Sequence, residues 1–124
     1  DIQPTLISYL NKNYVYEFAN KSYQNWFKKT QEQIVGRPMR EVIGERSFSA
    51  IKPLIDRALK GERQEFELWI PYATGEKYVH AVYNPDADAT GAINGIFISV
   101  ADKTEEKVFL DSLKSSEEQF ISLA

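Results

Sequence analysis

The stretch that decides the fold, residues 65–104, begins with Glu65-Phe66-Glu67-Leu68-Trp69-Ile70. This segment alternates apolar side chains with two glutamates, which is the period of a half-buried strand. Two further runs, Lys77–Tyr83 and Ile93–Ala101, are rich in β-branched and aromatic residues and predict two more strands. Turn residues separate the runs, and Asn84-Pro85 is expected to end the second of them. The stretch therefore predicts three consecutive strands that lead into a helix.

The rest of the chain predicts a single α+β domain. Residues 5–10 and 14–18 indicate two strands joined by a turn at Asn11-Lys12-Asn13. With the helical patterns that follow, the expected order is β-β-α-α-α-β-β-β-α. Strands from both ends of the chain, with helices between them, indicate a five-stranded antiparallel sheet with helices on one face. The domain is expected to span residues 5–107, and residues 108–124 to form an amphipathic linker helix.

Local signals place the expected helices. Asn20 stands where a helix N-cap is needed, ahead of aromatic residues at helical spacing. Thr30 and Gln33 form a capping-box pattern that opens a short helix. An apolar set at helical spacing predicts a longer helix over residues 47–60, in which Pro53 marks either the first turn or a kink.

The composition excludes several classes of function. The chain has 124 residues, a formal net charge of −3 and no cysteine, so a nucleic-acid partner, a disulfide scaffold and a thiol nucleophile are not expected. No apolar run approaches the roughly 18 residues of a membrane span, and we expect no direct membrane contact. Because the chain starts at Asp1 without methionine, we expect it to be part of a longer protein. We expect this domain in the cytoplasm. This expectation is compatible with a membrane anchor elsewhere in the parent protein.

The last segment carries a heptad pattern. The seam positions are spaced four, three, four and three residues apart, as in a coiled coil: Phe109, Leu113, Ser116, Phe120 and Leu123. Two interpretations follow from these residues. The helix folds back on its own domain, or it pairs with a second copy as a dimer helix that passes a signal onward.

In the order and spacing of its short motifs, the sequence resembles the PAS family of sensory domains. The motifs are spread over residues 5–107 and are Asn20, Ile34-Val35-Gly36-Arg37, Leu59-Lys60-Gly61-Glu62, Gly75, Asn84-Pro85, Gly91 and Ala101-Asp102-Lys103-Thr104-Glu105-Glu106-Lys107. The segment 113–124 is similar to the linker that joins PAS domains in tandem sensor proteins. The resemblance implies a sensory module within a signal-transduction protein, such as a histidine kinase of a two-component system or a diguanylate cyclase.

The resemblance argues against the flavin and haem cofactors of the family. A flavin-binding member would need a cysteine where this chain has Met39, and amide side chains where it has Ile70, Val79 and Val100. A flavin edge left buried and unpaired would cost about 1–3 kcal/mol per polar group. His80 is the only histidine, and by similarity to the family's strand phases it faces away from the interior. Neither haem nor a metal ion is therefore expected.

No sequence pattern indicates a catalytic site. The carboxylates Glu65 and Glu67 lie on the polar face of a predicted strand. No serine stands in a nucleophile motif, and no glycine-rich phosphate loop is present. We therefore expect this chain not to be an enzyme. A small cystatin-like or steroid-isomerase-like enzyme would need a different strand order and a deep polar pocket.

An interior cavity between the sheet and the helices is the first candidate site. Strand parity together with the resemblance predicts that it is lined by Ser8, Leu10, Tyr23, Met39, Ile55, Ile70, Tyr83, Ile98 and Val100. Two interpretations remain open. The residues form a close-packed core without room for a ligand, or they hold a small, mostly apolar ligand with Ser8 or Tyr83 as a polar anchor.

The outer face of the sheet is the second candidate site. It would carry more apolar surface than a solvated strand face usually does, from Tyr78, His80, Val82, Phe97 and Ala101. Such a patch is ordinarily covered by another chain or by a helix. Together with Phe109, Leu113 and Phe120 of the last segment, these residues form the expected partner face of a homodimer.

Asp102 and Thr104 form the third candidate, a hinge between the last strand and the exit helix. A carboxylate and a hydroxyl at this point can accept backbone N–H groups and cap the helix, and Lys77 is the expected basic partner of Asp102. We expect a change in the cavity or at the sheet face to shift this hinge, and the helix to relay the shift to an output domain in the same chain. The alternative is a ligand-free dimerisation module with a filled core.

Overall fold

The computed structural model describes the backbone of residues 5–123 and the side chains of residues 5–117. The elements, in chain order, are β1 (Thr5–Asn11), β2 (Tyr16–Ala19), α1 (Ser22–Phe27), the 3-10 turn η1 (Gln31–Gln33), α2 (Met39–Ile43), α3 (Glu45–Leu59), β3 (Gln64–Tyr72), β4 (Gly75–Ala87), β5 (Ile93–Asp102) and α4 (Thr104–Leu123). The predicted order of strands and helices is confirmed.

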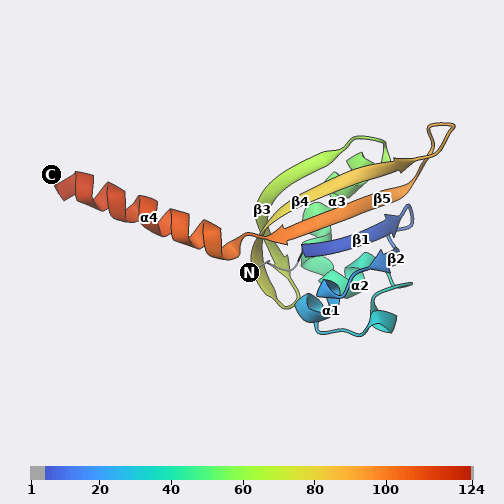
Figure 1. Cartoon of the computed structure of the whole chain (residues 1–124), viewed down its shortest axis with the longest axis horizontal. Coiled ribbons are helices and arrows are strands. Elements are labelled where there is room, and N and C mark those ends of the chain that lie inside the picture. Colours follow the sequence, from blue (N-terminus) through green and yellow to red (C-terminus); the bar gives the residue numbers. More distant parts are fainter. Residues whose placement is uncertain (1–4, 124) are drawn as a thin grey trace.

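The five strands form one antiparallel sheet with the spatial order β2-β1-β5-β4-β3. β1 pairs with β5 along its whole length, with Ser8 opposite Ile98, so the N-terminal hairpin and the last three strands share one sheet. Helices α1 to α3 lie on one face of this sheet, and α4 projects away from the domain beyond the end of β5 (Figure 1). The α+β fold with an exit helix is therefore as predicted.

The core lies between the sheet and the helices because strand residues of one parity point inward. In β4, Val79, Ala81 and Tyr83 are buried, whereas the residues between them are half-buried on the other face. α3 contributes Ile51 and Ile55 from its buried stripe, in keeping with the helical spacing of its apolar residues. The burial of this interior supplies the main stabilising force for the fold.

Asn20 does not cap α1, contrary to the prediction. The N-cap position belongs to Lys21, and the Asn20 side-chain amide instead donates to the carbonyl oxygen of Thr5 at 2.8 Å. The side chain therefore secures the start of β1 rather than the start of the helix. The capping box is confirmed, because the Gln33 side chain accepts the Thr30 N–H at 2.9 Å. It opens only a single 3-10 turn.

β4 continues past Asn84-Pro85, which were expected to end it. Pro85 lies opposite Ile96 of β5, but β3 begins only at Gln64, opposite Tyr83. On the β3 side, a proline at position 85 therefore removes no hydrogen bond of the sheet. Pro53 lies inside α3, so the alternative in which the helix begins near it is wrong. Among the described helices, none is long and apolar enough to span a membrane.

Candidate sensory site and exit hinge

The structure gathers the predicted cavity residues in the interior. All nine are buried, none with more than 5 % of its surface exposed: Ser8, Leu10, Tyr23, Met39, Ile55, Ile70, Tyr83, Ile98 and Val100. They come from β1, α1, α2, α3, β3, β4 and β5, so the predicted lining residues converge between the sheet and the helices. Eight of the nine are apolar or aromatic and belong to one hydrophobic cluster with the rest of the core.

The polar content of this interior comes mainly from tyrosines. The Ser8 hydroxyl lies 2.7 Å from the Tyr23 hydroxyl, and the Tyr23 ring meets the Tyr16 ring edge-on at 5.2 Å between centroids. Burial raises the pKa of Tyr23 to about 12 and raises that of Tyr16 and Tyr83 well above the usual value. These phenols therefore stay neutral and can serve as hydrogen-bonding groups but not as bases.

Two interior tyrosines were missed from the sequence. Tyr16 is 1 % exposed and lies opposite Leu10 across the β1–β2 pair. Tyr72, at the end of β3, is also buried and meets the Trp26 and Phe27 rings edge-on. In the short strand β2 the buried residues Tyr16 and Ala19 are three positions apart, which breaks the period of two. Tyr72 follows Pro71, a residue that favours a strand end. Neither position therefore carried a clear signal.

The exit hinge is built around the Asp102 carboxylate. One oxygen accepts both the backbone N–H of Thr104 at 2.9 Å and its hydroxyl at 2.6 Å, while the other accepts the Lys77 ammonium at 3.2 Å. The Thr104 hydroxyl oxygen in turn accepts the backbone N–H of Tyr78 at 3.0 Å. α4 therefore begins at a residue that is bonded to both β4 and β5.

The charge on Asp102 is maintained by these same contacts. Burial by itself raises the pKa of this carboxyl, but the hydrogen bonds from Thr104 and Lys77 outweigh burial and hold the pKa below its ordinary value. The Lys77 and Asp102 side chains are 30 % and 27 % exposed, so water screens their attraction only in part. The hinge is thus a partly buried ion pair that also caps a helix.

The outer sheet face is divided between an apolar half and a charged half. The predicted residues Tyr78, His80, Val82 and Ala101 are half-buried there, and Phe97 is 53 % exposed. On β3 and β4, the His80 ring nitrogen Nε2 lies 2.8 Å from Glu65, which also pairs with Arg63 at 3.0 Å. The hydrogen bonds from His80 and Arg63 lower the pKa of Glu65.

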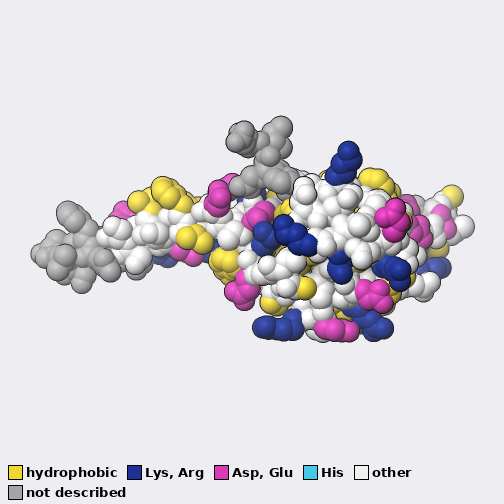
Figure 2. Space-filling view, turned by 90° about the horizontal axis from the view of Figure 1, so that it is seen from below, with side chains coloured by type: hydrophobic (Ala, Val, Ile, Leu, Met, Phe, Trp, Pro, Cys, Tyr) yellow, Lys and Arg dark blue, Asp and Glu magenta, His cyan; other side chains and the backbone are white. Residues whose placement is uncertain are grey.

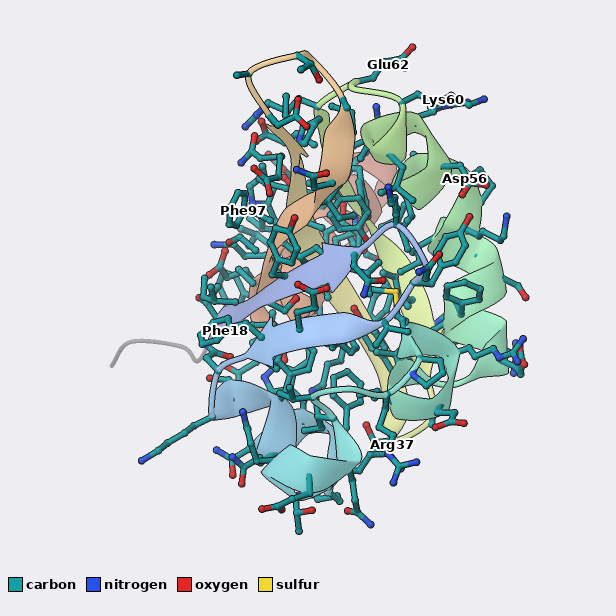
Figure 3. All side chains as sticks on the ribbon, turned by 90° about the vertical axis from the view of Figure 1, so that its right-hand side faces the viewer. Phe18, Arg37, Asp56, Lys60, Glu62 and Phe97 are labelled. Atoms are coloured by element: carbon teal, nitrogen blue, oxygen red, sulfur yellow. The ribbon has the colours of Figure 1, made fainter. Side chains whose placement is uncertain are left out.

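The apolar half of this face includes residues that the sequence did not single out. Phe18, Tyr9 and Phe97 lie side by side across β2, β1 and β5, and with Ile7 they border a shallow hollow of about 660 Å³. Phe18 and Phe97 point away from the helices on the other side of the sheet (Figure 3). In β1, the alternation of Ile7 and Tyr9 with buried Leu6 and Ser8 was the signal that could have revealed Ile7 and Tyr9.

Within residues 104–117, the large apolar side chains of α4 are exposed. Phe109 and Leu113, expected in the partner face, are 66 % and 55 % exposed, and Val108 and Leu110 are similarly open. Figure 2 shows hydrophobic side chains along the projecting helix α4. The described part of the helix therefore does not fold back on its own domain, which was one of the two interpretations. The side chain of Phe120 lies outside the described residues.

The described part of the chain gathers few metal-ligating side chains in one place. Within it, no group of three or more histidine, cysteine or acidic side chains could hold a metal ion. The inner-face positions Ile70, Val79 and Val100 are apolar and buried. The arrangement instead offers an aromatic interior, an exposed apolar sheet face and a capped hinge.

A family model described as PAS fold matches residues 1–108. The chain belongs to the PAS fold family. It is therefore a PAS domain, and its five-stranded sheet with an exit helix is the fold of that family. A comparison with curated proteins found no match.

Solved structures share this PAS fold at low sequence identity. The PAS domain of BvgS from Bordetella pertussis has a TM-score of 0.66 and 20% identity, over 94% of this chain and 88% of that one. A sensory box sensor histidine kinase from Vibrio cholerae has a TM-score of 0.67 and 18% identity, over 80% and 81%. The N-terminal domain of a diguanylate cyclase with a PAS/PAC sensor from Marinobacter aquaeolei has a TM-score of 0.65 and 10% identity, over 84% and 99%. These likenesses show the fold alone.

Proposed function

We propose that this PAS domain relays a change in its interior or on its outer sheet face through α4 to an output domain in the same chain. The single observation that carries the proposal is the Asp102–Thr104 hinge. Because Thr104 is bonded to Asp102 of β5 and to Tyr78 of β4, a relative displacement of these strands alters the start of α4. Allosteric relay needs such an element with two arrangements.

The output domain that we propose is a histidine kinase or a diguanylate cyclase. Support comes from the sensor histidine kinase and the diguanylate cyclase among the proteins with this fold, together with the linker-like sequence of residues 113–124. The catalytic step would then belong to the parent protein. This chain would supply its regulation.

Homodimerisation is part of the proposal. An exposed apolar sheet face and an exposed apolar helix, both in one domain, favour burial against a partner. The two copies would meet through Phe97 and its neighbours on the sheet and through Phe109 and Leu113 on α4. Sedimentation of the chain and of its Phe97→Glu variant tests this: we expect a dimer that the variant weakens, and a monomeric wild-type chain at micromolar concentration would contradict it.

The stimulus is proposed to be a small, mostly apolar ligand within the aromatic interior, held by Ser8 or Tyr83. The alternative, a ligand-free dimerisation module, is favoured by the close edge-on packing of the interior rings. Mass spectrometry of natively purified protein, together with a thermal-shift ligand screen, separates the two. A bound species or a thermal shift supports sensing, whereas the absence of both supports the filled core.

The relay is tested by Asp102→Ala in the full-length parent. We expect the domain to stay folded and the output activity to lose its regulation, because the hinge loses its acceptor for Thr104 and Lys77. Glu41→Ala, which removes an exposed carboxylate on α2 far from the hinge in sequence, is the matched control and should leave regulation unchanged. Normal regulation in the Asp102→Ala parent would contradict the proposal.

A further inference from the structure

The side chain of Lys77 contacts two elements at once. Its ammonium lies 3.2 Å from the Asp102 carboxylate of the hinge and 5.0 Å from the centre of the Trp26 ring on α1. A cation at this distance from an indole face is attracted by the negative face of the ring. Lys77 therefore joins α1 to the start of α4, although these elements are far apart in the sequence.

Strand parity explains why the three groups meet. Lys77 lies opposite buried Ile70 in the β3–β4 pair, and Asp102 lies opposite buried Val79 in the β4–β5 pair. Both side chains thus point to the helix-bearing face of the sheet, beyond the end of the apolar core. Figure 1 shows the hairpin of β3 and β4 reaching from the end of β5 towards α1.

The contact with α1 is made at two points. Besides the Lys77 ammonium over its ring, Trp26 offers its carbonyl oxygen, which accepts the Thr74 hydroxyl at 2.8 Å. Trp26 itself is 7 % exposed and packs edge-on against Tyr72 at 6.0 Å. The indole is therefore fixed by its surroundings and can act as a platform for the lysine.

α1 also reaches into the interior. Tyr23, one turn before Trp26, contacts the Ser8 hydroxyl and the Tyr16 ring in the core. Residues three apart on a helix lie on neighbouring positions of one face and move together. A displacement of Tyr23 would consequently displace Trp26, and through the Lys77 contact it would also affect Asp102.

We propose that Trp26 is a positioning residue for the exit hinge: its indole face holds the Lys77 ammonium against Asp102 and so couples α1 to the start of α4. This inference rests on the proposed relay function and adds the element through which the interior acts. The hinge would then receive its input from the helix layer, in addition to the sheet.

Hydrogen exchange of the 124-residue chain tests this assignment. We expect Trp26→Leu to speed exchange at the first-turn amides of α4, residues 104–107, by about two- to five-fold relative to amides of β5, the range of an ordinary cation–π contact. Lys77→Met should act in the same direction, and the double variant should exchange no faster than the stronger single variant. Trp26→Phe, which keeps an aromatic face, should restore most of the protection.

Phe27→Leu is the matched control. Phe27 neighbours Trp26 in the sequence, is equally buried and meets the same Tyr72 ring at 5.3 Å, and the described contacts place no ammonium over it. It should lower global stability without speeding exchange at residues 104–107 relative to β5. Equal effects of Phe27→Leu and Trp26→Leu, or additive effects of Trp26→Leu and Lys77→Met, would overturn the assignment.

A spectroscopic measurement covers the case in which Trp26→Leu does not fold. In a Trp69→Phe background, Trp26 is the only tryptophan. In that background, Lys77→Met should shift the fluorescence emission of Trp26, whereas Lys77→Arg should not. An unchanged emission in Lys77→Met would overturn the assignment. In the parent protein, faster hinge exchange with normal regulation would refute the relay function and leave the role of Trp26 standing.

Discussion

Tyr14 provides a sharp test of how a strained turn is held in place. Its φ of 63° lies in the left-handed region, which a bulky residue occupies only when its surroundings compensate the strain. The hydroxyl of Tyr14 donates to Asp56 on α3 at 2.5 Å, and its ring meets Phe48 edge-on at 5.5 Å. The tip of the β1–β2 hairpin is thereby anchored to the long helix.

We expect Tyr14→Phe to isolate the hydroxyl contribution because it retains the ring and the backbone. A hydrogen bond to a charged acceptor contributes about 1.5–3 kcal/mol when buried. The Asp56 side chain is 34 % exposed, so screening by water reduces the expected loss of unfolding free energy to about 1 kcal/mol. For a domain of this size, that loss lowers the melting temperature by about 4 °C.

The loss should depend on pH in a defined direction. The bonds from Lys52 and then Tyr14 lower the folded-state pKa of Asp56 below its ordinary 3.8. The stabilisation is therefore complete above the ordinary pKa and is lost as the pH falls through the lower, folded-state pKa. The stability difference between the wild-type chain and Tyr14→Phe should be constant near neutrality and should shrink below about pH 4.

The measurement is urea unfolding of the wild-type chain, Tyr14→Phe, Asp56→Asn and the double variant at pH 7. The coupling between the two sites should be about 1 kcal/mol. A coupling within the error of about 0.3 kcal/mol would refute the reasoning, and it would mean that the Tyr14 hydroxyl does not help to hold the strained turn.

Three further substitutions should fall in a definite order of cost in thermal unfolding. Gly95→Ala should be the most damaging, at about 2 kcal/mol or more, because its Cβ would lie 2.6 Å from the Tyr9 hydroxyl and closer still to backbone. Ser8→Ala should cost about 1 kcal/mol, since the buried Tyr23 hydroxyl loses a partner at 2.7 Å. Ser47→Ala should be nearly neutral, within about 0.5 kcal/mol, because the carbonyls that its hydroxyl contacts also accept backbone N–H groups.

The sheet and its inner face could be predicted from the sequence because the pattern was regular there. In β4 and β5, alternating burial follows directly from the period of two, so Tyr83, Ile98 and Val100 were placed correctly in the interior. The contact between Asp102 and Thr104 could also be predicted from the sequence, because the Asp102 carboxylate accepts the backbone N–H of a residue only two positions away. Local chemistry of this kind needs no knowledge of the rest of the fold.

Positions decided by contacts distant in sequence were harder to predict. Asn20 has the ordinary chemistry of an N-cap, yet it bonds to Thr5 because β1 and β2 pair beside it. Pro85 is tolerated in β4 only because β3 stops short of it. The proposed role of Trp26 depends on the contact of its ring with the Lys77 ammonium, and no residue spacing in the sequence indicates that contact.

Tyr78 explains why the interior and the outer face could act on the same output. Its N–H donates to the Thr104 hydroxyl, its carbonyl accepts the Lys103 N–H at 2.7 Å, and its ring lies 5.2 Å from the Lys107 ammonium. Its own ring is on the outer face, whereas the next residue, Val79, is fully buried in the core. A ligand that displaces Val79 and a partner that presses on Tyr78 would therefore move the same segment of β4. Since the apolar side chains of Val108, Phe109, Leu110 and Leu113 on α4 are exposed, this segment and the neighbouring Asp102 are where either input would reach the proposed relay.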